Sequence, residues 1–152
     1  MGHKTGFTLI ELLIALVILA IISAIAVPLY TSYSLRTYRN EAQGDLLGCA
    51  QGLERFASIN FTYQNTADTD ADGIGDADAG PIAAEICQTR SVDQNRYTIT
   101  VVATAAGYTL TADPQAGPTV ADGFMTLDDG GNRNWDKDDN NVIGAGEDNW
   151  NY

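Results

Sequence analysis

Residues 4–28 read KTGFTLIELLIALVILAIISAIAVP, and this stretch decides how the chain is organised. Nearly every side chain in residues 7–29 is apolar, over a length sufficient to cross a bilayer, which takes about 20 residues. A short basic segment precedes the stretch, as in a secretory signal. The chain then continues as VPLYTSYSLR, with no small-x-small cleavage site after the apolar run. The stretch therefore indicates a membrane helix rather than an ordinary signal peptide.

Two residues set this helix apart from a plain membrane anchor. Glu11 lies among leucines and isoleucines, where an isolated carboxylate costs about 2.5 kcal/mol or more. No cation lies within a helical turn of it on the apolar side, so we expect its partner to come from elsewhere. Pro28 removes one backbone hydrogen bond and is expected to kink or loosen the helix around residues 24–28.

Together these residues give the segment a specific resemblance. It is similar, without a gap, to the class III signal of type IV prepilins. The resemblance implies that a membrane-embedded prepilin peptidase cleaves after Gly6 and methylates the new terminal amine at Phe7. It also implies that Glu11, the fifth residue after the cut, pairs with the amine of a neighbouring subunit. Pro28 matches the family proline.

The resemblance implies an organisation for the whole chain: a leader at 1–6, a transmembrane and filament-core helix at 7–30, and a globular head at 31–152. We expect an α+β fold of the type IV pilin kind, with a long N-terminal helix packed on an antiparallel sheet of about four strands. The expected parts of the head are an amphipathic helix at 31–58, a helix-to-sheet loop at 61–95, a sheet at 96–135 and a C-terminal acidic loop at 136–152.

Apolar residues spaced three and four apart predict the second half of the helix. They are Leu35, Tyr38, Ala42, Leu46, Cys49, Leu53 and Phe56. Charged residues, Arg39 among them, are expected mainly off this face. Gly44, Gly48 and Gly52 recur every fourth residue on another face. They indicate either close helix–helix approach in a filament or glycines that are merely tolerated.

Strand patterns follow in the second half of the chain. Alternating apolar residues and threonines predict strands at 96–104 and 108–113, a third at 123–128 and a short fourth near 132–135. The segments YTLTADP and FMTLDDGGNRNW resemble the last strands of minor pilins. The cysteines that close a terminal loop in many of those relatives are absent here, so we expect the tail to be held by other means.

The chain has two cysteines, Cys49 and Cys87, and neither a CxxC motif nor a Cys/His cluster that would indicate zinc. If the head is exported, a disulfide is the natural interpretation, and two buried thiols are the alternative. A bridge would join the helix to the loop after it. In the chain-entropy model it would stabilise the fold by about 4 kcal/mol.

Two acidic segments have the spacing of calcium loops. The first, DTDADGIGDAD at 68–78, resembles the loops of thrombospondin type 3 and dockerin repeats. Alternating carboxylates before a turn glycine can surround a hard cation that takes six to eight oxygens. The expected ligands are Asp68, Asp70, Asp72, the Ile74 carbonyl, and Asp76 or Asp78 in place of the missing twelfth-position glutamate.

The second segment, DKDDNNVIGAGE at 136–147, resembles an EF-hand loop. Its expected ligands are Asp136, Asp138, Asn140, the Val142 carbonyl and Glu147. Asn141 stands where the turn glycine would be, and asparagine tolerates the left-handed conformation better than most residues. For both segments the alternative is a solvated acidic loop. We expect one or two calcium ions, the second of which would hold the tail.

Composition excludes several other functions. The net charge of −12 argues against nonspecific binding to nucleic acid, which needs lysines and arginines, and no specific nucleic acid is predicted as a partner. The one histidine, His3, lies in the expected leader, so the commonest general base is lost on processing. No nucleophilic constellation or phosphate-binding loop is present, and we expect no enzyme activity.

Two structural functions remain. The first is a subunit of a type IV pilus that serves adhesion, twitching motility or DNA uptake. The second is a pseudopilin of type II secretion, which the terminal strand pattern favours less. The expected partners are other copies or other pilins in a helical filament, prepilin peptidase and the inner-membrane assembly machinery. The chain would reside in the inner membrane as a prepilin and then in an extracellular filament.

Overall fold

The structure is a computed structural model and describes residues 7–115, 117 and 119–151. The expected cleavage residue Gly6 lies outside the described residues. The chain divides into two compact units, Met1–Ser34 and Leu35–Tyr152. One helix, α1 (Leu9–Asn60), contributes residues to both units.

In the first unit α1 is mostly apolar, with Glu11 as its one charged residue. Its large side chains are about half exposed or more, from 49% at Leu13 to 81% at Leu9. Among the described residues, α1 is the one helix long and apolar enough to cross a membrane. The helix continues through Pro28, whose carbonyl accepts a hydrogen bond from the Thr31 hydroxyl at 2.9 Å. Among the described residues, the large apolar side chains of this segment are thus left exposed to the surroundings.

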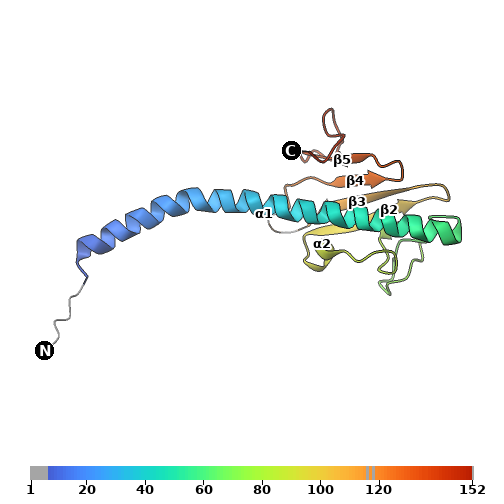
Figure 1. Ribbon diagram of the computed structural model, residues 1–152, viewed down its shortest axis with the longest axis horizontal. Coiled ribbons are helices and arrows are strands. Elements are labelled where there is room, and N and C mark those ends of the chain that lie inside the picture. The colour runs from blue at the N-terminus through green and yellow to red at the C-terminus, as the bar shows by residue number, and fades with distance from the viewer. Residues whose placement is uncertain (1–6, 116, 118, 152) are drawn as a thin grey trace. The chain divides into compact units, whose positions relative to one another are not determined.

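The second unit, the head, consists of the rest of α1 and a five-stranded antiparallel sheet (Figure 1). Each strand pairs with its neighbour in sequence. The strands are β1 (Ala79–Pro81), β2 (Tyr97–Ala103), β3 (Tyr108–Pro114), β4 (Met125–Asp128) and β5 (Arg133–Trp135). The fold is the expected α+β arrangement of a long N-terminal helix with an antiparallel sheet.

Alternation along the strands creates the core. Tyr97, Ile99, Val101 and Ala103 of β2 are buried, while the residues between them are partly or fully exposed. Successive side chains of a strand point to opposite faces, so one face of the sheet is apolar and covers α1. The helix supplies the facing side of the core with Ala42, Leu46, Cys49 and Leu53, as its spacing predicts.

Two elements were not anticipated within the expected loop at 61–95. Strand β1 reads Ala-Gly-Pro, a composition that disfavours strands. It can form because β1 is an edge strand that pairs with β2 alone. Proline has no N–H to donate to the ladder, and an edge strand needs no donor on its unpaired side. Helix α2 (Arg90–Asp93) is a single turn, too short for a periodic signal. The sheet therefore has one strand more than the four expected.

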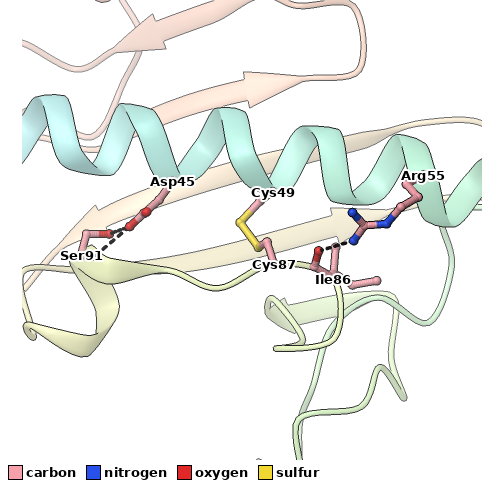
Figure 2. Close-up of a disulfide and its surroundings, with 6 residues drawn as sticks. All are labelled: Asp45, Cys49, Arg55, Ile86, Cys87 and Ser91. Atoms are coloured by element: carbon pink, nitrogen blue, oxygen red, sulfur yellow. Dashed lines mark hydrogen bonds between the residues drawn. A yellow bond between two sulfur atoms is a disulfide. The ribbon is translucent and has the colours of Figure 1, made fainter.

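Three contacts attach the segment 86–91 to α1 (Figure 2). A disulfide joins Cys49 to Cys87, which are 38 positions apart in sequence and have Cα atoms 4.9 Å apart. One turn before it, the Asp45 carboxylate accepts a hydrogen bond from the Ser91 backbone N–H at 2.7 Å. One turn or more after it, Arg55 donates to the Ile86 carbonyl at 3.4 Å. The bridge expected from the cysteines is thus formed, within a longer line of contacts.

Arg39 departs from the expected helix pattern. It was placed mainly off the apolar face, yet it is only 6% exposed. Its guanidinium pairs with Asp122, a residue 83 positions later in the chain that is 3% exposed. A charged group is buried only when it is paired and hydrogen-bonded, and Asp122 meets both needs. Helical spacing cannot reveal a partner at that separation.

The repeated glycines of α1 divide by environment. A Cβ atom on Gly52 would lie 2.2 Å from the Ile86 carbonyl oxygen, so this position needs glycine for the head to close on segment 86–91. A Cβ atom on Gly44 or Gly48 would meet nothing within 4 Å. Gly52 therefore serves packing inside the head, and a role between helices remains open only for the other two.

This difference gives a matched pair of variants. Gly44→Ala should stabilise the head by about 1 kcal/mol, because alanine favours a helix over glycine. Gly52→Ala should destabilise it, because the new methyl group overlaps a backbone carbonyl that the nearby disulfide holds in place. Denaturant unfolding of both variants, with disulfides intact, measures the two free energies. Equal effects would contradict the assignment of Gly52 to internal packing.

Candidate functional site

The first candidate site is the start of α1. The backbone N–H of Thr8 donates to Glu11 Oε2 at 2.9 Å, and the Thr8 hydroxyl donates to the same oxygen at 2.8 Å. In return, the Glu11 N–H donates to the Thr8 hydroxyl oxygen at 3.3 Å. This is a capping box, in which a threonine and a glutamate three residues later satisfy the free N–H groups of a helix start.

The capping box adds two hydrogen bonds to Glu11 beyond the expected pairing. Its carboxylate accepts them from Thr8 of the same chain, while the pairing with the amine of a neighbouring subunit stays a prediction. The spacing T-x-x-E is the sequence signature of a capping box, with Glu11 as the third residue of the helix. Phe7, the expected methylated residue, lies just outside the helix and is 90% exposed.

The second candidate site is the first acidic loop. Carboxylate oxygens of Asp68, Asp70 and Asp72 lie within 4.8 Å of one another. The loop is closed at its base by a bridge between Ala67 and Ala77, whose backbones exchange hydrogen bonds at 2.9 and 3.1 Å. Gly73 has a φ of +90°, which provides the sharp turn expected of it. Three of the expected ligands are therefore brought together.

The remaining expected ligands of this loop have other partners. Asp76 accepts hydrogen bonds from the Thr69 backbone N–H and hydroxyl, at 3.0 and 3.1 Å. Asp78 lies beyond the closing bridge and accepts from the Asn65 N–H at 2.9 Å. Ile74, whose carbonyl is the expected ligand atom, follows the turn, and its backbone N–H donates to Asp72 at 2.8 Å. The structure thus places Asp76 and Asp78 outside the group of three.

Charge repulsion is evident in this loop. The Asp72 backbone N–H favours the ionised form of Asp70, but the neighbouring carboxylates, that of Asp72 first, outweigh it together with desolvation. The pKa of Asp70 is consequently raised above its ordinary value. Like charges that crowd one another are stabilised by a cation among them. Glu85, which the sequence did not single out, lies against the loop and accepts from the Gly75 N–H at 2.9 Å.

The third candidate site is the second acidic loop. Carboxylate oxygens of Asp136, Asp138 and Glu147 lie within 4.8 Å of one another. Asp136 is fully buried and Glu147 is 7% exposed, whereas Asp138 is exposed. Asn140 also lies in this loop, and its side-chain amide donates to Asp138 at 2.8 Å. Asn141 has a φ of 65°, the left-handed conformation expected of it.

Glu147 connects this loop with the C-terminal tail. Its Oε1 accepts from the Lys137 N–H at 2.7 Å, and its Oε2 accepts from the Gly144 N–H at 2.6 Å. Its backbone carbonyl accepts from the Trp135 N–H at 2.9 Å, at the outer edge of β5. Further along, the Trp150 indole donates to the Asn134 carbonyl at 3.0 Å. The tail is therefore folded back on β5 through Glu147 and Trp150.

The two acidic loops share a hydrogen-bond pattern. In each, the first carboxylate accepts from the N–H of the sixth residue: Asp68 from Gly73, and Asp136 from Asn141, both at 2.7 Å. In each, the fifth side chain accepts from the N–H of the seventh residue, Ile74 or Val142, at 2.8 Å. Both loops thus gather hard oxygen ligands around a tight turn, a donor set that fits a divalent cation such as calcium.

Comparison with known families covers most of the chain. The family described as "Type IV minor pilin ComP, DNA uptake sequence receptor" matches residues 28–123. The "Prokaryotic N-terminal methylation motif" matches residues 1–27. The two matches are consecutive, and the first alone covers more than half of the chain. No solved structure matches.

Individual relatives include both filament and secretion proteins. The Type IV major fimbrial protein FimA of Dichelobacter nodosus is 34% identical over 100 residues, 65% of this chain and 52% of the relative. The Fimbrial protein of Moraxella nonliquefaciens is 38% identical over 78 residues, 49% of this chain and 48% of the relative. The Type II secretion system core protein G of Pseudomonas aeruginosa is 36% identical over 64 residues, 42% of this chain and 45% of the relative.

The chain thus spans about half the length of these relatives. A methylation motif, an apolar helix that can cross a membrane and an antiparallel sheet packed on its second half occur here in one protein. With the family match over residues 28–123, these features show that the chain belongs to the type IV pilin family.

Proposed function

We propose that this protein is a structural subunit of a type IV pilus. The observation that carries the proposal is the pair of consecutive family matches, a methylation motif at 1–27 and a minor-pilin family at 28–123. The prepilin would reside in the inner membrane through the apolar part of α1. Prepilin peptidase would cleave it after Gly6 and methylate Phe7, and the mature chain would join an extracellular filament with other pilins.

The filament role follows from the surface of the first unit. Its apolar side chains are exposed along the whole segment Leu9–Leu29. A soluble monomer rarely exposes so large an apolar surface to water. Lipid can cover it before assembly and equivalent helices of other subunits can cover it afterwards. Glu11 would then pair with the Phe7 amine of a neighbour, a pairing that fixes the register while desolvation offsets much of its energy.

A type II secretion pseudopilin is the second candidate, because one relative carries that name. The match to FimA is longer, 100 residues against 64, which favours the pilus. Deletion of the gene distinguishes the two functions. Loss of surface filaments in electron micrographs supports the pilus, whereas a secretion defect without loss of filaments supports the pseudopilin.

Binding of DNA by this chain has little physical support. Outside residues 1–6 it has seven basic and twenty acidic residues, since Lys4 is the one charged residue in that segment. Arg39 is buried against Asp122, and Arg90 lies 3.6 Å from Glu41. Nucleic-acid binding depends on accessible clusters of lysine and arginine. The charge argues against recognition of DNA, whereas the matching family is described as a DNA uptake sequence receptor, so we propose adhesion, twitching motility or DNA uptake as the contribution of this subunit.

We further propose that both acidic loops bind calcium. Three carboxylates converge in each loop, and the hard oxygen ligands suit this ion. In the second loop, burial of Asp136 and Glu147 makes a nearby cation more favourable still. An ion there would join the start of the loop, at Asp136, to the tail, at Glu147. It would perform the task of the terminal disulfide found in many minor pilins.

Processing is tested at the expected cleavage residue. Gly6→Ala should block cleavage, because the peptidase has to fit the backbone before the cut. Intact mass spectrometry of the purified variant then shows the full prepilin mass. The chain that retains Gly6 should instead lose its leader and gain a methyl group. Gly2→Ala is the matched control and should be processed. A cleaved Gly6→Ala chain would contradict the assigned site.

Assembly is tested at Glu11 with two substitutions. Glu11→Ala should be cleaved and stable but form few filaments. Glu11→Gln retains an acceptor for Thr8 and so preserves the cap, but it lacks the charge that pairs with an amine. Both variants should therefore assemble poorly in electron micrographs of sheared filaments. If the Gln variant assembles normally, Glu11 serves only to cap the helix.

Calcium binding is tested by thermal unfolding of the detergent-solubilised chain. Calcium at about 100 times Kd should raise the Tm by about 5–10 °C for each occupied loop. Asp70→Ala should remove the contribution of the first loop and Asp138→Ala that of the second, and the double variant should show no shift. Asp93→Ala, in an exposed acidic position outside both loops, is the control. An unchanged Tm after chelation of the unmodified chain would refute both sites.

A further inference from the structure

A buried polar cluster lies directly behind the second acidic loop. We call Arg39, Tyr97, Asp122 and Trp135 the Arg39 cluster. Arg39 Nε lies 2.9 Å from one carboxylate oxygen of Asp122 and 3.1 Å from the other, and Arg39 Nη2 also donates to this carboxylate. The Tyr97 hydroxyl donates to the same carboxylate. Helix α1, strand β2 and the loop between β3 and β4 thus meet at one ion pair.

Trp135, the last residue of β5, completes the cluster. Its ring centroid lies 3.8 Å from the guanidinium carbon of Arg39, and its indole N–H donates to the Asp122 backbone carbonyl at 2.7 Å. Trp135 therefore contacts both members of the ion pair. An aromatic face attracts a guanidinium, and more strongly where water is excluded.

The same segments also position the two buried carboxylates of the loop. The N–H of Asp136 donates to the carbonyl of Phe124, two residues after Asp122 in sequence, at 3.0 Å. A Cβ atom on Gly123 would lie 1.7 Å from the Asp136 carbonyl oxygen, so the two backbones are in direct contact. On the other side, Trp135 N–H holds the Glu147 carbonyl at 2.9 Å. A shift of Trp135 or Asp122 would therefore move Asp136 and Glu147 as well.

At its other end the cluster holds the first packed turn of α1. Arg39 is the earliest buried residue of the helix, ahead of Ala42 and Leu46. The charged Arg39 side chain thus lies at the point where α1 begins to pack on the head. A close-packed interior transmits strain, so a displacement of Arg39 is passed on to the side chains that pack around it.

We infer that the Arg39 cluster couples cation binding at the second acidic loop to the packing of residues 35–42 of α1 against the head. The inference rests on the calcium site proposed above and concerns its regulation. A bound cation requires Asp136 and Glu147 to stay in place, and the cluster supplies that constraint. By linkage, the cation in turn favours the state in which Arg39 is docked.

The coupling is tested by calcium titration of the full chain in detergent micelles. Asp70→Ala is included throughout, so that only the second loop binds. Arg39→Lys retains the charge but loses the two-pronged, planar contact with Asp122 and Trp135. It should weaken calcium binding by about tenfold in isothermal titration, within the usual range for coupled sites. Arg55→Lys, on the same helix but outside the cluster, should bind as the parent does.

Hydrogen exchange reports the reciprocal effect. Calcium should slow amide exchange in residues 35–42 of the parent and leave it unchanged in Arg39→Lys. A substitution that only weakens the fold would instead speed exchange along all of α1, with and without calcium. If Arg39→Lys does not fold, Trp135→Phe, which retains a ring but loses the indole donor, should show the same loss of affinity to a smaller degree.

Two results would overturn the inference, and they differ from each other. If the parent binds no calcium at the second loop, the proposed metal site itself is wrong and the coupling with it. If the parent binds calcium and Arg39→Lys or Trp135→Phe binds it equally well within twofold, the site stands and the coupling is wrong. Titration of the parent alone separates these cases.

Discussion

The head depends on one packing constraint, which is that a single face of α1 must be covered by a sheet of short strands. Leu46, Cys49 and Leu53 of the helix share one apolar core with Ile99, Leu110 and Met125 of the sheet. So small a core gives the long connections few apolar partners, Ala67, Ala83 and Ile86 among them. The connections are also attached to α1 by specific bonds: the Cys49–Cys87 disulfide, the Asp45–Ser91 hydrogen bond and the Arg39–Asp122 ion pair.

The attachments occur along the helix in the reverse of the order of their partners in the chain. Arg39 holds the connection between β3 and β4, and Cys49 with Asp45 holds the segment before β2. Beyond the reach of the helix, the chain relies on carboxylates that accept several backbone N–H groups. Asp68 and Asp136 each organise a turn in this way. In the outer loops, hydrogen bonds to carboxylates therefore fix the backbone in place of apolar packing.

The helix, the strands from β2 to β5 and the disulfide could be predicted because each follows from local spacing or composition. What could not be predicted depends on distant partners. Strand β1 exists only because β2 accepts it as an edge, despite its glycine and proline. Arg39 is expected mainly off the apolar face of the helix, because its partner Asp122 is 83 positions away and leaves no local signal. In each acidic loop the spacing identifies three carboxylates that converge. It does not reveal the Ala67–Ala77 bridge, which closes the first loop before Asp78 and so leaves Asp78 outside that loop.

The capping box at the start of α1 has a consequence for how a filament of such subunits would grow and shorten. Glu11 is already satisfied by Thr8 while the subunit is alone, so joining a neighbour replaces existing hydrogen bonds rather than creating the first ones. An exchange of partners has a small net free energy even when each bond is strong. A subunit can then leave the polymer without passing through a state in which a bare carboxylate faces lipid. Addition and removal of a subunit would then both exchange one set of hydrogen bonds for another, with a small net free energy at this residue.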